Sequence, residues 1–330
     1  MDFTKIKDLA DRVKENVGKV IVGKSQVIDL VLIALISSGH ILLEDVPGMG
    51  KTLLAKSLAK SLDLDFKRVQ FTPDLLPADI TGLHYFNQNE GDFSFRKGPI
   101  FTNILLGDEI NRATPRTQSS LLEAMEERQV TIDGKTFRLE EPFTVIATQN
   151  PVETRGTFPL PEAQLDRFLV KVSMGYPDKA EGLLILKRFK DQQPLESIEK
   201  QVTRDEIIWA RRSYSSVYVC DDILAYIMDI VDATRDHPDL ALGVSPRGSQ
   251  ALLKAAQAYA VIEGRSYVSP DDIKRLAKPV LAHRVMLRST IRAKEGQADK
   301  IIGQILEQIR VPAEETLMPT DQRTKEKGLI

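Results

Sequence analysis

The segment LLEDVPGMGKT, residues 42–52, places a glycine loop between an apolar run of strand length and a helical pattern. In such a loop, successive backbone N–H groups and the N-terminus of the next helix point at one anion. Gly48 and Gly50 let the main chain approach phosphates without a Cβ in the way. Lys51 can reach the β- and γ-phosphates, and Thr52 offers a hydroxyl to Mg²⁺. The segment therefore predicts an α/β fold with a nucleotide site.

The loop departs from the usual pattern G-x-x-x-x-G-K-[ST] at its first position, where Asp45 stands in place of glycine. Position 45 is where the strand ends and the chain turns, so a carboxylate is compatible with phosphate if it points away. The alternative is a glycine turn that merely caps a helix. The strand before the loop and the helix after it favour a nucleotide site. We predict that this site comprises Asp45, Val46, Pro47, Gly48, Met49, Gly50, Lys51, Thr52 and Leu53.

Strand and helix patterns alternate from the loop to about Tyr176, which predicts a parallel sheet flanked by helices. The runs KRVQF, NILLGDE, FTVIATQN and FLVKVSM have strand character. A turn signal at NEGD and another at Asp133-Gly134 predict two β-hairpins inserted into this core. Gly107 interrupts the apolar run before Asp108 and is expected to loosen that strand end.

The 330 residues exceed one typical domain. After Tyr176 the pattern becomes helical, and Thr203 with Glu206 forms a capping box at the start of one helix. The fold class is therefore a P-loop NTPase sheet followed by a smaller all-helical lid. The predicted domains are an α/β nucleotide-binding core over residues 1–176, with an N-terminal helix and linker over 1–25, a connecting helix and linker over 177–202, a helical lid over 203–311 and a polar tail over 312–330.

Polar side chains follow two further buried strands at the points where they end. Asp108 and Glu109 end the run ILLGDE, and Asn150 follows VIATQ. Ligands of open α/β sheets bind at the carboxyl ends of the strands. We predict that Asp108 holds Mg²⁺ with Thr52, that Glu109 polarises the attacking water, and that Asn150 orients this water. The alternatives are a solvated strand end for the acidic pair and a turn cap before Pro151 for the asparagine.

Two arginines are predicted to bind nucleotide phosphate. Arg167 lies between a short helix and a strand, and Arg247 lies in the first turn of a helix. A phosphoryl-transfer transition state is stabilised by an arginine, often from another subunit. A cation at a helix N-terminus opposes the macrodipole, which favours an external anion as its partner. Both arginines are expected to lack local partners, with ordinary surface positions as the alternative. Arg112 and Arg155 compete with Arg167 for its role.

The composition argues against several other classes of site. Lys+Arg is 45 against Asp+Glu 47, so no global basic field indicates nucleic acid. The basic segments FRKG and GKTFR have the character of solvated hairpin tips, and no pairing of aromatic with basic residues in a binding face is expected. The single Cys220 excludes an intrachain disulfide, and the four histidines have no ligand spacing, so the only metal expected is nucleotide-bound Mg²⁺. The longest apolar run is too short to span a bilayer, which predicts a cytoplasmic protein.

Five ordered blocks resemble the MoxR group of AAA+ ATPases over nearly the whole chain: EDVPGMGKT, FTPDLLPADITG, GPIFTNILLGDEINRATPRTQSSLLEAMEERQVTIDG, ATQNPVETRGTFPLPEAQLDRF and SPRGSQALLKAAQAYA. The resemblance implies that the acidic residue at position 45 is a feature of the group. It also implies two hairpins of the helix-2-insert clade. The roles implied are Walker A for Gly48, Gly50, Lys51 and Thr52, Walker B for Asp108 and Glu109, sensor 1 for Asn150, trans arginine finger for Arg167 and sensor 2 for Arg247.

The resemblance further implies Mg²⁺-dependent ATP hydrolysis by a homo-oligomer, a hexameric ring, that acts as a chaperone or remodelling factor on partner proteins. Partners with von Willebrand A-type domains and metal-centre maturation belong to this expectation. An ATP-switched binding module with incidental turnover and a DNA-directed motor stay open as alternatives. ATP-dependent partner binding that survives Glu109→Gln would favour the first. DNA-stimulated hydrolysis with a steep salt dependence would favour the second. Whether Arg247 acts on the nucleotide of its own subunit or of a neighbour also stays open.

Overall fold

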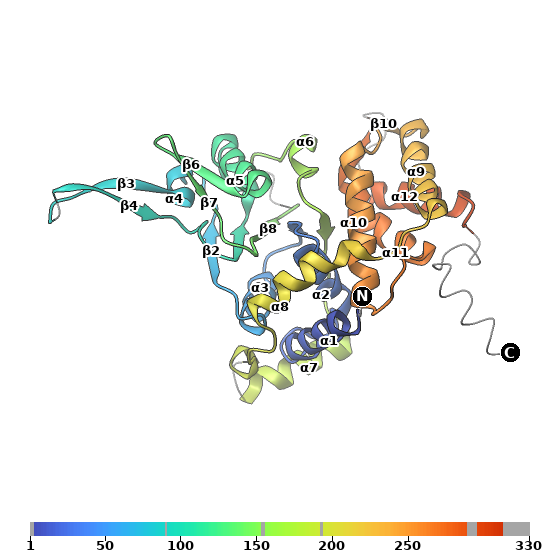
Figure 1. Ribbon diagram of the computed structural model, residues 1–330, viewed down its shortest axis with the longest axis horizontal. Coiled ribbons are helices and arrows are strands. Elements are labelled where there is room, and N and C mark those ends of the chain that lie inside the picture. Colours follow the sequence, from blue (N-terminus) through green and yellow to red (C-terminus); the bar gives the residue numbers. More distant parts are fainter. Residues whose placement is uncertain (1–2, 90, 153–155, 192–193, 289–295, 313–330) are drawn as a thin grey trace.

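A five-stranded parallel sheet forms the centre of the N-terminal part of the chain (Figure 1). The computed structural model describes residues 3–89, 91–152, 156–191, 194–288 and 296–312. The strands are parallel in the order β2-β5-β8-β1-β9, which confirms the predicted parallel sheet. These strands are β1 (Ile41–Glu44), β2 (Phe66–Gln70), β5 (Ile104–Asp108), β8 (Thr144–Gln149) and β9 (Val170–Val172).

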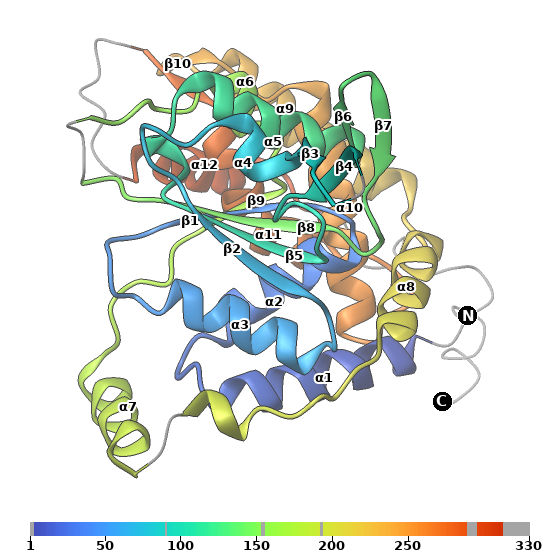
Figure 2. The same ribbon diagram turned by 90° about the vertical axis from the view of Figure 1, so that its left-hand side faces the viewer.

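Helices cover both faces of this sheet (Figure 2). Successive strand residues point to opposite faces. Accordingly, Ile41 and Leu43 belong to the hydrophobic cluster formed with three helices on one face, and Leu42 belongs to the cluster on the other face. The first face carries α1 (Thr4–Gly18), α2 (Ser25–Ile36) and α3 (Lys51–Ser61), and the second carries α4 (Pro77–Thr81) and α5 (Pro115–Glu127). Burial on both faces explains why the central strands are continuous apolar runs.

Both predicted hairpins are present. They are β3 (Gly82–Asn87) with β4 (Asp92–Lys97), and β6 (Gln129–Ile132) with β7 (Lys135–Arg138). Asp133 and Gly134 form the second turn with φ of 49° and 77°, the positive values that a two-residue hairpin loop requires. The first hairpin projects from the body of the molecule (Figure 1). Phe95 stacks on Phe137 with ring centroids 4.6 Å apart, so the bases of the two hairpins are joined.

Gly107 does not loosen the end of β5. It pairs with Val69 on β2 and with Ala147 on β8, inside the sheet. A Cβ at this position would lie 3.2 Å from Cε2 of Phe71, whose side chain is fully buried. The expectation of a loosened strand end is therefore wrong. Glycine leaves room here for the ring of Phe71.

The C-terminal part of the chain is helical, with one short antiparallel pair that the hydropathy pattern does not signal. The predicted capping box of Thr203 and Glu206 is present. Helices α10 and α11 pack against α2 and β9, so the helical part lies along the β9 edge of the sheet. None of the described helices combines the length and apolar character that a bilayer span requires. The short helix α6 (Glu162–Leu165) precedes β9, and the elements after β9 are α7 (Lys179–Asp191), α8 (Arg204–Ser213), α9 (Asp221–Asp236), β10 (Leu240–Leu242), α10 (Pro246–Ile262), α11 (Pro270–Leu281), β11 (Met286–Leu287) and α12 (Gln297–Gln308).

Two histidines are buried in this fold without charge. Nδ1 of His40 accepts a hydrogen bond from the backbone N–H of Val145 at 2.9 Å, and its Nε2 donates to the carbonyl of Met125 at 2.9 Å. Burial lowers the pKa of His40 to about 3, and burial also lowers the pKa of His283 well below its ordinary value. Both rings are therefore neutral near pH 7 as structural parts of the core.

These histidines should make the fold sensitive to acid. The unfolded chain takes up their protons near pH 6.5, whereas the folded chain does not, so the free energy of unfolding decreases as pH falls below about 6.5. For His40 this decrease continues towards pH 3. Each histidine should lower the free energy of unfolding by about 1.4 kcal/mol per pH unit in this range. Urea denaturation at pH 7.5 and 5.0 measures the change. In His40→Gln the decrease between the two pH values should be smaller, and an equal decrease would contradict the assignment.

Candidate active site

The glycine loop leads from the carboxyl end of β1 into α3. Gly48 and Gly50 have φ of 87° and 84°, a region that side-chain-bearing residues rarely adopt. Nζ of Lys51 donates a hydrogen bond to the backbone carbonyl of Asp45 at 2.6 Å, so the side chain folds back over its own loop. Burial lowers the pKa of Lys51, and the nearby carboxylates of Asp108 and Glu109 oppose this shift. The loop, Lys51 and the acidic end of β5 therefore gather at one place.

The carboxylate of Asp45 points away from the loop. It accepts hydrogen bonds from Oγ of Ser173 at 2.8 Å and from the backbone N–H groups of Met174 at 2.6 Å and Gly175 at 3.2 Å. It thus fastens the start of the loop to the chain that leaves β9. The position tolerates an acid because these three donors satisfy the carboxylate, and phosphate does not have to face it.

Removing this carboxylate should loosen the loop. Asp45→Ala leaves the buried backbone N–H of Met174 and the half-buried one of Gly175 without their acceptor. This is expected to lower the free energy of unfolding by about 1–3 kcal/mol and to weaken nucleotide binding. Urea denaturation and titration with a fluorescent ATP analogue measure the two effects. Asp45→Asn keeps one acceptor oxygen and should lose less. Equal stability and affinity in Asp45→Ala and the wild type would contradict this role.

Asp108 lies at the carboxyl end of β5 and is held by two neighbouring strands. Its Oδ2 accepts from Nη2 of Arg68 at 2.6 Å, and its Oδ1 accepts from Oγ1 of Thr148 at 2.6 Å. Carboxylate and hydroxyl oxygens are the ligands that Mg²⁺ prefers, and Mg²⁺ is usually bound through few protein oxygens together with substrate phosphates. Asp108 and Thr52 fit this chemistry, with the Arg68 ion pair as the contact that competes for the carboxylate.

Glu109 follows directly in a strained conformation, with φ of 57°. Its backbone N–H donates to Oγ1 of Thr148 at 2.8 Å. Its carboxylate accepts from Nε2 of Gln70 at 2.8 Å and from Nη1 of Arg112 at 3.0 Å. Arg112 is therefore occupied with a carboxylate of its own subunit. Backbone strain is often found where a side chain has to be aimed at a reacting group.

Asn150 follows β8, which lies between β5 and β1 in the sheet. Its side chain is buried, and its Oδ1 accepts from the backbone N–H of Val152 at 3.1 Å. The residue thus caps a turn, as the structural alternative supposed. The same position lies between the strand ends that carry Glu109 and the glycine loop, so the three predicted strand ends are neighbours.

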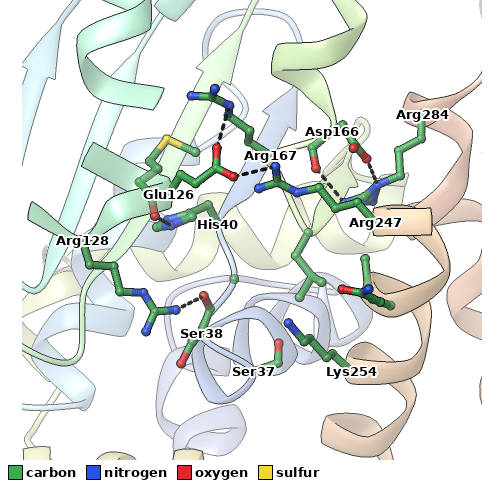
Figure 3. A pocket seen from close by; sticks show the side chains of 15 residues that line it. Ser37, Ser38, His40, Glu126, Arg128, Asp166, Arg167, Arg247, Lys254 and Arg284 are labelled. Atoms are coloured by element: carbon green, nitrogen blue, oxygen red, sulfur yellow. Dashed lines mark hydrogen bonds and ion pairs between the residues drawn. The ribbon is translucent and has the colours of Figure 1, made fainter. Parts of the chain in front are cut away.

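Arg167 and Arg247 lie elsewhere, at the amino-terminal ends of the strands. Arg167 precedes β9, and the register pairs Ile41 at the start of β1 with Val170 at the start of β9. The four residues of β1, about 13 Å of extended chain, separate these amino-terminal strand ends from the glycine loop. Arg247, at the N-terminus of α10, lies beside Arg167 (Figure 3).

Both arginines have a local partner, Glu126 in the last turn of α5. Glu126 Oε2 lies 3.2 Å from Nε of Arg167, and its Oε1 lies 2.9 Å from Nη1 of Arg247 (Figure 3). The expectation that these arginines lack local partners is therefore wrong. Glutamates in the EAMEER segment resemble an ordinary solvated helix face, so the sequence carries no signal for this contact.

The paired arginines open onto a cavity of about 300 Å³ with an excess of positive charge. Arg284 is buried there and donates to Oδ1 of Asp166 at 2.8 Å, and burial lowers its pKa to about 10. Since His40 is neutral, five cationic side chains face two carboxylates, an excess of three positive charges. The charged lining residues are Glu126, Arg128, Asp166, Arg167, Arg247, Lys254 and Arg284. Arg155, the remaining competitor for the finger role, lies outside the described residues.

Aromatic and basic side chains also meet at the junction of the two hairpins. Nζ of Lys97 lies 5.4 Å from the ring centroid of Phe101, and both residues line a cavity of about 460 Å³ with Phe137 and Arg138. Aromatic and basic side chains are therefore neighbours where the two hairpins meet. Phe137 is already stacked on Phe95, which accounts for the aromatic character of this junction through packing.

Comparison with known proteins gives matches over most of the chain. The model of the ATPase family associated with various cellular activities (AAA) matches residues 40–170, and that of the AAA lid domain matches residues 232–305. The uncharacterized protein YeaC of Bacillus subtilis is 51% identical over 93% of this chain and 96% of its own. Chaperone MoxR1 of Mycobacterium tuberculosis is 39% identical over 90% of this chain and 80% of its own. A crystal structure of a protein from Cytophaga hutchinsonii has a TM-score of 0.88 at 40% identity, covering 94% of this chain and 97% of that one.

Proposed function

Because the chain belongs to the MoxR family of AAA ATPases, we propose that it works as an oligomer whose ATP sites are completed between neighbouring subunits. The ATPase activity itself follows from the AAA domain and from the relatives. The proposal concerns how the activity is organised. The arrangement that we propose is a hexameric ring, in which each subunit presents Arg167 and Arg247 to the glycine loop of the next.

The position of the two arginines is the observation that carries this proposal. Arg167 and Arg247 lie at the amino-terminal ends of the strands, and the glycine loop lies at their carboxyl ends. Neither arginine can stabilise phosphate bound to the loop of its own subunit without crossing the length of β1. In a head-to-tail ring, the amino-terminal strand ends of one subunit face the carboxyl strand ends of the next. The geometry thus supports action in trans for Arg247 as well as for Arg167.

Within each site, Lys51 and the loop amides bind the β- and γ-phosphates. Mg²⁺ held by Thr52, Asp108 and phosphate oxygens would neutralise charge that develops on these oxygens. Glu109 takes a proton from the attacking water, and Asn150 orients that water. Gln70 and Arg112 both bond Oε2 of Glu109, so Oε1 is the oxygen offered to the water. The neighbour's Arg167 and Arg247 then face the γ-phosphate, where negative charge accumulates in the transition state.

The work done with ATP is proposed to be the remodelling of partner proteins. The name Chaperone MoxR1 for a relative supports this role. The projecting β3–β4 hairpin carries apolar side chains in solvent, with Phe93 67% and Phe86 53% exposed. Contiguous exposed apolar side chains mark protein interaction sites. In its specific form, the proposal is that the partners carry von Willebrand A-type domains and that the remodelling serves metal-centre maturation.

ATP hydrolysis per subunit, measured over a wide range of protein concentration, tests the organisation of the site. Completion between subunits predicts a specific activity that rises with concentration and then levels off as rings form. Light scattering on the same samples should show the oligomer over the same range. A specific activity that is constant, down to concentrations where only monomers are present, would contradict the proposal.

A further inference from the structure

Glu126 is fixed from both sides in the chain. The carbonyl of Met125 accepts from Nε2 of buried His40 at 2.9 Å, and Nη2 of Arg128 donates to the carbonyl of Ser38 at 2.9 Å. The end of α5 is therefore tied to the segment that enters β1. Glu126 projects from this tied helix end to the rim of the cationic cavity, where the two arginines meet it (Figure 3).

The carboxylate leaves most hydrogen-bond donors of both arginines unused by this contact. Nη1 of Arg247 donates one hydrogen bond to it, and Nε of Arg167 forms an ion pair with it at 3.2 Å. A guanidinium carries five N–H donors in a planar fork, so each arginine retains donors for a second anion. With Glu126 present the charged lining still has its excess of positive charge, and the cavity continues to favour a polyanion such as phosphate.

Without Glu126, the two guanidinium groups would repel each other and their cationic neighbours. Asp166, the other carboxylate of the lining, is already held by Arg284. Like charges at close range disfavour the arrangement in which both arginines face one point. A carboxylate between them holds the pair together before any phosphate arrives, and preorganised donors are what a charged transition state requires.

We propose that Glu126 is a positioning residue that holds Arg167 and Arg247 as a pair for the phosphates of the neighbouring subunit's nucleotide. This inference rests on the proposed function, since it concerns the same site. Glu126 touches no nucleotide itself. The three side chains are 37%, 30% and 44% exposed, so the two ion pairs contribute little to stability. Loss of Glu126 should therefore change catalysis and leave the fold intact.

The test compares the wild type with Glu126→Ala, Glu126→Asp, Arg167→Ala and the double variant Glu126→Ala/Arg167→Ala. Glu123→Ala, an exposed carboxylate one turn earlier on α5, is the matched control. We expect Glu126→Ala to lower kcat about tenfold, with KM for ATP and the oligomer in light scattering unchanged within about twofold. Glu126→Asp should restore most of the rate, and Glu123→Ala should match the wild type.

The double variant separates positioning from other effects. If Glu126 acts through the arginines, its removal should add little to Arg167→Ala, because coupled residues are not additive. Activity of Glu126→Ala equal to or above the wild type, beside an inactive Arg167→Ala, would overturn this inference alone. The same tenfold loss in the Arg167→Ala background would also overturn it. Full activity of Arg167→Ala would overturn the proposed function, and this inference with it.

Discussion

Replacing Glu109 by glutamine should lower the rate of ATP hydrolysis by about a hundredfold or more, because general-base catalysis contributes factors of this size. Glutamine keeps the shape of the side chain and can still bond Gln70, but it cannot accept a proton from water. ATP binding should be unchanged, since the contacts of Lys51 and the loop remain. Phosphate release under saturating ATP measures the rate, and titration with a fluorescent ATP analogue measures affinity.

The control for this change in charge is Glu140→Gln, an exposed carboxylate that pairs with Arg204 away from the strand ends. It should retain the activity of the wild type. Hydrolysis by Glu109→Gln at the rate of the wild type would show that another group activates the water. A partner that still binds Glu109→Gln only with ATP would move the chain towards the switched binding module.

Replacing Arg167 by alanine should lower the turnover number about a thousandfold, the lower end of what a trans arginine contributes. The affinity for ATP should change little, because Arg167 lies at the opposite ends of the strands from the glycine loop of its own subunit. Arg167→Lys should recover only part of the rate, since lysine keeps the charge but lacks the planar fork. Steady-state kinetics at a protein concentration that saturates the oligomer measures all three values.

Arg212→Ala, at an exposed arginine of α8, controls for the loss of one positive charge and should be active. Activity of Arg167→Ala near the wild-type level would exclude Arg167 as the finger and overturn the proposed function. Arg112 would then be a poor substitute in its present position, because it is bound to Glu109 of its own subunit.

The parts of the molecule that local patterns encode could be predicted from the sequence. Buried parallel strands are continuous apolar runs, and Asp133-Gly134 has few alternatives to a hairpin turn. The predicted polar residues Asp108, Glu109 and Asn150 directly follow or end such runs, so the runs are enough to predict that they lie at the carboxyl ends of strands. The strand order, which the structure supplies, makes those strand ends neighbours.

Contacts between distant segments could not be predicted in the same way. The donors that satisfy Asp45 lie about 130 residues further along the chain, and no local pattern links them. The expected role of Gly107 was wrong because its reason is the ring of Phe71, a packing neighbour from β2's end. No local pattern marks Glu126, because an acidic residue on a helix face is usually solvated and only the fold brings two arginines to it.

Mixing two inactive variants tests the central claim most directly. Lys51→Ala lacks the phosphate-binding lysine but keeps Arg167 and Arg247. Arg167→Ala keeps the glycine loop but lacks the arginine finger. If each site is built from two subunits, an equal mixture should recover about one quarter of the wild-type activity, because one interface in four then pairs an intact loop with an intact arginine. Activity of the mixture no higher than that of the separate variants, with mixed oligomers demonstrated by differential labelling, would contradict a site completed between subunits.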